Sequence, residues 1–136
     1  MDKIEAIKFL AMVKVAYPNS YKDMDKASKQ ATVNMWQVSF PTTPFAIISM
    51  AFDNFRRRST FPPTVAEINK ELASLYYQAM EEANTHRWMG NDDGFNKCRY
   101  IMQCTVEFKE NKTRINYGEI TPQMISERNQ YLLGGD

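Results

Sequence analysis

Few side chains in this 136-residue sequence are of the types that perform acid–base, nucleophilic or metal chemistry. His86 is the only histidine, so a two-histidine zinc site or a histidine relay would lack its second member. Asn91-Asp92-Asp93-Gly94 contains part of the pattern of a calcium loop, but the alternating oxygen ligands and the closing glutamate are missing, and a plain turn is the better interpretation. We therefore predict no catalytic residues, no metal site, no cofactor and no enzymatic activity.

The cysteines and glycines add no further chemistry. Cys98 and Cys104, six residues apart on one predicted helix, would lie about 240° apart around its axis and could not form a disulfide. Reduced thiols are typical of cytoplasmic proteins. None of the five glycines belongs to a phosphate-binding pattern, so the sequence predicts no ATP-driven activity.

Side chains suited to binding are more numerous. Arg56, Arg57 and Arg58 end a predicted helix, where they are candidate contacts for DNA or for an acidic partner. The alternative is that these cations only complement the dipole of the helix C-terminus.

The chain is also rich in methionine, with nine, and in phenylalanine and tyrosine, with fifteen together. A small C-terminal core cannot bury all the large apolar side chains of that half, and the surplus predicts an interaction surface. Its candidate partner-binding residues are Phe95, Tyr100, Tyr117, Met124, Ile125, Tyr131, Leu132 and Leu133.

Helical periodicity and helix-end signals predict the elements that position these residues. The expected helices cover residues 2–16, 23–39, 44–58, 64–88, 95–108 and 122–133. A strand remains an alternative over 95–108, because that segment is rich in β-branched and aromatic residues. The polar stretch 110–118 is predicted to be loose. The fold class is therefore all-α, a small helical bundle with an additional C-terminal helical segment.

Two helix starts carry specific expectations. Thr43 is predicted to cap the third helix with its hydroxyl, with proline at the first helical position. Thr64 and Glu67 have the spacing of a capping box, and Phe61 is placed to pack on the first turn as a hydrophobic staple.

Each of the first four helices has a predicted buried stripe. The stripes are Ile4, Ile7, Leu10, Ala11 and Met12; then Met24, Ala27, Ala31, Met35 and Val38 with Trp36 beside them; then Phe45, Ile48, Phe52 and Phe55; then Val65, Ile68, Leu72, Leu75 and Ala79.

Composition and charge exclude several classes of protein. Hydrophobic residues make up 43% and charged residues 24%, and the formal net charge of +1 argues against a histone-like protein. Residues 1–64 hold nine basic and five acidic side chains, whereas residues 65–136 hold eight and eleven, which hints at two faces with different partners. No segment is long and apolar enough to span a membrane, and the acidic N-terminus is unlike a signal peptide, so we expect a cytoplasmic protein.

Three features occur together in order: a helix ending in Ala16-Tyr17-Pro18, a helix that carries Trp36, and the stretch Phe61-Pro62-Pro63-Thr64-Val65-Ala66-Glu67-Ile68 opening the next helix. Over residues 1–75 the chain thereby resembles the bacteriophage replicative-helicase loader and inhibitor family. The resemblance implies a helical scaffold built on Leu10, Tyr17, Pro18, Trp36, Phe52, Phe61, Pro62, Pro63 and Ile68.

The resemblance also implies a function. Members are replication proteins without ATPase activity that bind a hexameric replicative DNA helicase, load it at the origin and inhibit its ATPase, and they also contact an origin-binding protein. We expect a four-helix N-terminal domain over residues 1–89 and an interaction segment over 90–136, in the cytoplasm of a bacterial host, with direct DNA binding weak or absent. Two alternatives remain open: a small phage protein that inhibits a host factor, and a helical DNA-binding regulator.

Overall fold

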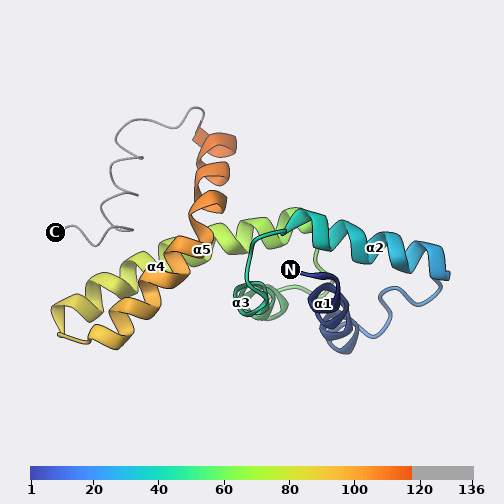
Figure 1. Ribbon diagram of the computed structural model, residues 1–136, viewed down its shortest axis with the longest axis horizontal. Helices are drawn as coiled ribbons and strands as arrows, with labels where there is room; N and C mark the ends of the chain where they lie inside the picture. Colours follow the sequence, from blue (N-terminus) through green and yellow to red (C-terminus); the bar gives the residue numbers. More distant parts are fainter. Residues whose placement is uncertain (118–136) are drawn as a thin grey trace. The chain divides into compact units, whose positions relative to one another are not determined.

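The computed structural model describes the backbone of residues 1–117 and the side chains of residues 1–110. This part of the chain contains helices and no strand, which confirms the all-α fold class (Figure 1). The helices are α1 (Lys3–Ala16), α2 (Lys26–Ser39), α3 (Phe45–Arg56), α4 (Val65–Trp88) and α5 (Asp92–Tyr117). The predicted sixth helix, 122–133, lies outside the described residues.

The chain divides into two compact units, Met1–Ile68 (the N-terminal unit) and Asn69–Asp136 (the C-terminal unit). The boundary between them falls inside the first turns of α4, so this helix contributes residues to both units. The domain division expected at residues 89 and 90 stays a prediction.

Five aromatic side chains form the centre of the N-terminal unit, in which α1 packs against both α2 and α3. The Phe9 ring lies 4.8 Å from the ring of Trp36 and 5.6 Å from that of Phe52, measured between centroids. Phe40 stacks on Trp36, and Tyr17 meets Phe52 edge-on. Such pairs add about 0.5–1.5 kcal/mol each to the free energy gained by burial.

The buried faces of α1 and α2 differ from the predicted stripes. In α1 the buried side chains are Ala6, Phe9 and Val13, whereas the predicted Ile4 and Ile7 are exposed. The apolar residues of α1 occupy more than one side of the helix, so periodicity alone selected the wrong side.

In α2 the indole of Trp36 is the one fully buried side chain, and Met35 and Val38, both predicted to be buried, are exposed. Met35 precedes Trp36 by one residue and therefore points about 100° away from it. The large indole decides which face of α2 turns toward the core.

The start of α3 also differs from its prediction. The N-cap position is Pro44, which provides no side-chain hydrogen bond, and the helix begins one residue later, at Phe45. Thr43 is buried instead of capping, and its carbonyl accepts a hydrogen bond of 3.3 Å from the amino group of Met1, which also donates to the carbonyl of Phe40. The buried stripe of α3 is confirmed for Ile48, Phe52 and Phe55, whereas Phe45 is half-buried.

The capping box at the start of α4 is confirmed. The Thr64 N–H donates to the Glu67 carboxylate over 3.1 Å, and the Glu67 N–H donates to the Thr64 hydroxyl over 3.2 Å. The staple prediction is wrong: Phe61 is 76% exposed and Pro63 is buried in its place. A long-range hydrogen bond of 2.9 Å, from the Tyr17 hydroxyl to the Ser59 carbonyl, fixes the preceding loop against the end of α1.

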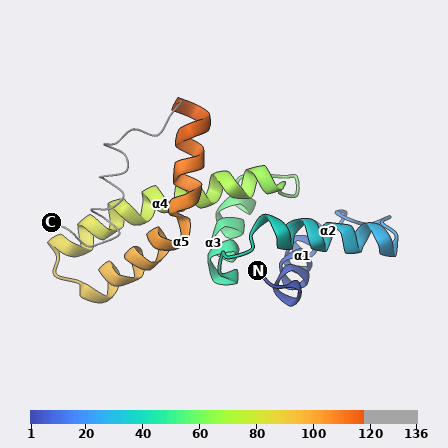
Figure 2. The ribbon, with the colours of Figure 1, turned by 45° about the horizontal axis from the view of Figure 1, so that its top comes forward.

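The C-terminal unit contains an antiparallel helical hairpin, in which α5 begins beside the end of α4 (Figures 1 and 2). Gly90 makes the turn with a φ of 69°, a conformation that glycine adopts without strain. The helix then starts at Asp92, because the Asn91 side chain accepts a hydrogen bond of 3.1 Å from the N–H of Gly94. The loop expected between the predicted helices 64–88 and 95–108 is therefore too long, because α5 already begins at Asp92.

Close packing explains why glycine occupies position 94, which was predicted to lie in that loop. A Cβ atom at Gly94 would lie 2.6 Å from Nδ1 of the half-buried His86, so glycine is required where the two helices approach each other. Toward the other end of the hairpin, the Lys109 ammonium lies 5.4 Å from the centre of the Tyr76 ring. In the described part of this unit, the buried residues are Glu71, Leu72, Ala73, Leu75, Tyr76, Ala79, Ala83, Cys98, Ile101, Met102, Thr105, Phe108 and Lys109.

Two further expectations concern α5. The segment 95–108 is helical, so the strand alternative is wrong. The segment 110–117, predicted to be loose, continues the same helix to Tyr117. Its polar composition does not prevent helix formation, because helix propensity is high for lysine, glutamate and arginine.

Candidate partner-binding surfaces

Among the described side chains of the C-terminal unit, the most exposed large apolar ones lie at the tip of its hairpin. Trp88 ends α4 with 92% of its surface exposed, and Met89 follows it with 77% exposed. Sequence reasoning treated Trp88 only as a helix end. The sequence does contain a signal for this exposure. Trp88 directly precedes the Met-Gly-Asn turn and lies nine residues beyond Ala79, the last residue of the predicted buried stripe.

Phe95, a predicted partner-binding residue, lies close to this tip and is half-buried. The guanidinium carbons of Arg87 and Arg99 lie 5.7 and 5.9 Å from the centre of its ring. These are cation–π distances, so two charged groups partly cover the ring. The tip therefore combines exposed apolar surface with basic groups.

Tyr100, another predicted partner-binding residue, is 50% exposed on α5. A hydrogen bond with the Cys104 thiol raises the pKa of the Tyr100 phenol. Tyr117 is the last residue of α5, and its side chain lies outside the described part of the chain. The remaining candidates are also outside the described residues: Met124, Ile125, Tyr131, Leu132 and Leu133.

Cys98 is buried on the side of α5 that faces α4. Burial raises the pKa of its thiol, and the nearby negative charge of Glu82 raises it further; the sulfur lies 3.9 Å from a Glu82 carboxylate oxygen. A thiol held protonated in this way is a poor nucleophile. Among the residues that the structure describes, no group of three histidine, cysteine or carboxylate side chains could hold a metal ion.

The three predicted arginine contacts are all exposed at the C-terminal end of α3. Arg56 Nε makes an ion pair of 3.0 Å with the Asp53 carboxylate, and Arg57 occupies the C-cap position. Beside Arg56 the surface is hollowed between α1 and α3 by a recess of about 550 Å³ that Met12 and Phe52 help to line. This arrangement fits both interpretations, a binding patch and a helix C-terminus complemented by cations.

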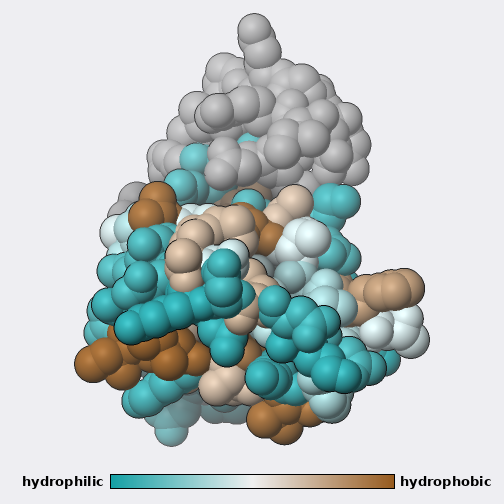
Figure 3. Space-filling view, turned by 90° about the vertical axis from the view of Figure 1, so that its right-hand side faces the viewer, coloured by the Kyte–Doolittle hydropathy of each residue, from teal (hydrophilic) through white to brown (hydrophobic). Residues whose placement is uncertain are grey.

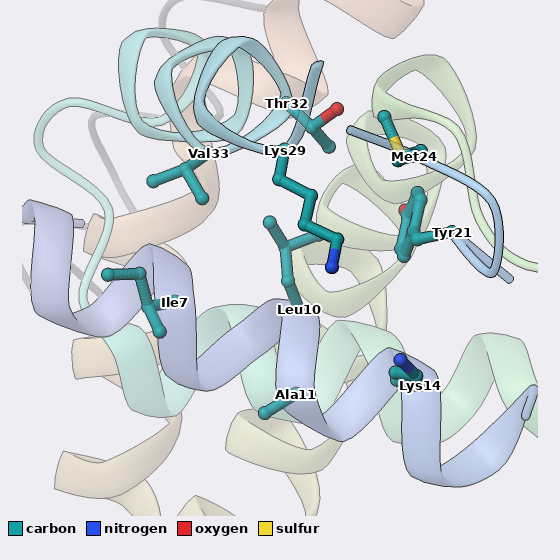
Figure 4. A pocket seen from close by; sticks show the side chains of 9 residues that line it. All are labelled: Ile7, Leu10, Ala11, Lys14, Tyr21, Met24, Lys29, Thr32 and Val33. Carbon is teal, nitrogen blue, oxygen red and sulfur yellow. The ribbon is translucent and has the colours of Figure 1, made fainter. Parts of the chain in front are cut away.

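A second recess, which sequence reasoning missed, lies between α1, α2 and the segment that joins them. This recess, the α1–α2 groove, has a volume of about 230 Å³. The residues that line it are Ile7, Leu10, Ala11, Lys14, Tyr21, Met24, Lys29, Thr32 and Val33 (Figure 4). No local sequence pattern predicts this groove, because its walls come from two helices and a loop that only the fold brings together.

Tyr21 is the unusual residue of this groove. Its φ of 59° places it in the left-handed region, which bulky side chains rarely adopt, so the surrounding structure must hold it there. Burial raises the pKa of its phenol, and the nearby indole of Trp36 partly opposes that shift. The ring of Tyr21 thus connects the groove to the aromatic core.

Exposed large apolar side chains of the N-terminal unit come from α1, from α2 and from the loop before α4. On the side shown in Figure 3, apolar residues reach the surface in several separate patches among hydrophilic ones. The exposed large apolar residues of this unit are Ile4, Ile7, Val15, Met35, Val38 and Phe61. In the described part of the chain, no helix is long and apolar enough to cross a membrane.

Comparison with known proteins identifies the family to which the N-terminal unit is similar. A family model for the N-terminal domain of the gp39P phage helicase loader and inhibitor proteins matches residues 1–69. The matched range ends one residue beyond the compact unit Met1–Ile68. No curated protein and no solved structure matches the chain.

Proposed function

The chain belongs to the phage family that loads and inhibits the replicative DNA helicase, and from this premise we propose that it binds a hexameric helicase, loads it at the phage origin and inhibits its ATPase. The observation that carries the proposal is the family match over residues 1–69, which covers half of the chain and coincides with a compact unit. In this proposal the chain is a non-enzymatic adaptor in the host cytoplasm, and an origin-binding protein is a further partner.

The mechanism follows from differential affinity. A ligand shifts a conformational equilibrium only by the difference between its affinities for the two states. The chain therefore binds an open or strained helicase ring more tightly than a closed ring. While it is bound, ATP hydrolysis is suppressed; when the ring closes on DNA, the affinity falls and the chain dissociates.

We place the helicase contact in the C-terminal unit, at the hairpin tip. Trp88 and Met89 are the most exposed large apolar residues of its described part, and Phe95 and the exposed Tyr100 follow on α5. Tryptophan and tyrosine are frequent among the residues that dominate binding free energy at interfaces. The arginines around Phe95 suit an acidic rim on the helicase.

The first test measures complex formation and ATPase activity together. The full-length chain is mixed with a phage-encoded or a host replicative helicase, with and without ATP, and the mixture is analysed by size-exclusion chromatography with light scattering. We expect a complex whose stability depends on nucleotide, and suppression of the helicase ATPase. Absence of a complex with either helicase contradicts the proposal and favours inhibition of another host factor.

A pair of matched variants tests the contact. Trp88→Ala/Met89→Ala removes exposed apolar surface from the hairpin tip, and Met35→Ala/Val38→Ala removes exposed apolar surface from α2. We expect the tip variant to weaken helicase binding by about tenfold or more and the α2 variant to leave it unchanged. Urea unfolding of both variants checks that stability is retained. If the tip variant binds normally, the helicase contact lies elsewhere.

A further inference from the structure

The α1–α2 groove has the size and lining of a site for side chains of another protein. Its volume of about 230 Å³ is below the roughly 300–1,000 Å³ that is usual for small-molecule sites. Along α1 it extends from Ile7 to Lys14, about 10 Å at the rise of an α-helix, which is the length of two helical turns. Two turns of a docked helix present apolar side chains at the spacing that such a groove accepts.

The walls of the groove are apolar and adaptable. Ile7 and Leu10 contribute from α1, Val33 contributes from α2, and Met24 contributes from the joining segment. Ile7 is half exposed although it is a large apolar residue, and methionine adapts its shape to different ligands. The left-handed backbone at Tyr21 holds the tyrosine ring at the groove, at the cost of a sparsely populated conformation.

Charge decides which partner fits. The charged side chains that line the groove are Lys14 and Lys29, and no acidic side chain lines it. Figure 4 shows Lys29 extending from α2 across the groove toward α1. Within the described part of the chain, neither lysine side chain makes an ion pair or a hydrogen bond. Both ammonium groups are therefore available to carboxylates of a ligand.

We propose that the α1–α2 groove binds an acidic amphipathic helix of a partner protein, whose apolar side chains enter the groove while its carboxylates pair with Lys14 and Lys29. This surface lies in the N-terminal unit and requires neither the helicase nor the hairpin tip, so it goes beyond the proposed function. It gives the chain a second partner-binding surface with its own charge preference.

Synthetic peptides of about four helical turns provide the probes. A panel carries leucine or phenylalanine at every third or fourth position, and each peptide exists in two forms, flanked by glutamate or by lysine. Amide chemical shifts of the full-length protein report binding. We expect the acidic forms to shift amides around Leu10, Tyr21 and Val33, to leave those of α5 unchanged, and to bind more tightly than the basic forms.

Charge-reversal variants distinguish binding at this groove from nonspecific electrostatic attraction to the protein surface. Lys14→Glu/Lys29→Glu is expected to weaken binding of the acidic peptide by about tenfold and to strengthen binding of its basic form. Lys8→Glu/Lys26→Glu changes the net charge equally on the same two helices but outside the groove lining, and is expected to keep the original preference.

Three results overturn the proposal. The first is that no peptide of the panel shifts the groove amides at concentrations up to about 1 mM. The second is that acidic and basic forms bind the unmodified chain equally. The third is that the groove variant and the control variant bind the acidic peptide alike. None of these results depends on the helicase, so they leave the proposed function standing.

Discussion

At the scale of single residues, the two tryptophans show how one side-chain type takes two roles. Trp36 is buried against Phe9 and Phe40, where its ring contributes to the core of the N-terminal unit. Trp88 is almost fully exposed at the end of α4. Replacing Trp36 removes core volume and disturbs folding, whereas replacing Trp88 removes only surface. For this reason Trp88 is the informative position for testing helicase binding.

The thiol of Cys98 predicts a pH dependence of stability. Burial and the nearby Glu82 raise the pKa of this thiol in the folded state, so the unfolded thiol ionises first as the pH rises past its ordinary value of about 8.5. The contribution is fully present below that pH and is lost above it. We expect the free energy of unfolding to fall as the pH rises above about 8, by less than about 1.4 kcal/mol per pH unit.

The control for this prediction is Cys98→Ala, which removes the titrating group. Urea unfolding of both proteins at several pH values gives the two slopes. The alanine variant is expected to start less stable, because it loses buried volume, and then to fall less steeply with pH. Parallel slopes for the two proteins would show that the Cys98 thiol does not titrate differently in the folded state.

At the scale of secondary structure, the contact between Gly94 and His86 sets how closely α4 and α5 approach. A methyl group at Gly94 meets the His86 imidazole, so Gly94→Ala is expected to destabilise the chain by about 1–3 kcal/mol. In a His86→Ala background the clash is absent, and alanine gains from its higher helix propensity. There the same substitution is expected to stabilise by about 0.5–1 kcal/mol.

Thermal or urea unfolding of the four proteins in this double-mutant cycle measures the coupling. A change of sign between the two backgrounds is the expected signature. Gly90→Ala is the matched comparison: it has no neighbour within 4 Å of the added Cβ, so any loss comes from its positive φ and does not depend on His86. Equal effects of Gly94→Ala in both backgrounds would show that the loss of stability comes from the backbone at position 94 and not from contact with His86.

At the scale of the whole molecule, the charge distribution predicts how tightly the chain binds DNA and how that affinity depends on salt. The net charge is only +1, and the exposed cluster Arg56, Arg57 and Arg58 offers at most three contacts to phosphates. We expect weak binding to duplex DNA, with a slope of log affinity against log salt no steeper than about −3. Arg56→Ala/Arg57→Ala/Arg58→Ala is expected to flatten that slope while leaving inhibition of the helicase ATPase unchanged.

The control replaces three lysines, Lys8, Lys22 and Lys26, by alanine, which removes the same charge from other positions. Fluorescence anisotropy with a labelled duplex at several salt concentrations measures the slopes. If both triple variants lose affinity equally, the binding is general attraction to a polyanion. Tight binding with a much steeper slope would instead favour the DNA-binding regulator that the sequence left as an alternative.

Sequence by itself determined the class of the fold, the family and most helix ends. Helix ends are local: proline after Tyr17 and the capping box of Thr64 and Glu67 act through neighbouring backbone groups, so they are visible without a structure. The family rests on a motif that is contiguous in the chain, and the match over residues 1–69 confirms the resemblance.

Tertiary structure decided which helix faces are buried and which residues share a surface. Phe9 and Trp36 turn α1 and α2 toward each other on sides that periodicity did not select, because apolar residues occupy several sides of both helices. Thr43 does not take its expected capping role because α3 begins one residue later, with Pro44 at the N-cap, and Thr43 itself is buried. Lys14 and Lys29 line one groove only because α1 packs beside α2. Burial depends on what covers a face, and that partner is distant in the sequence.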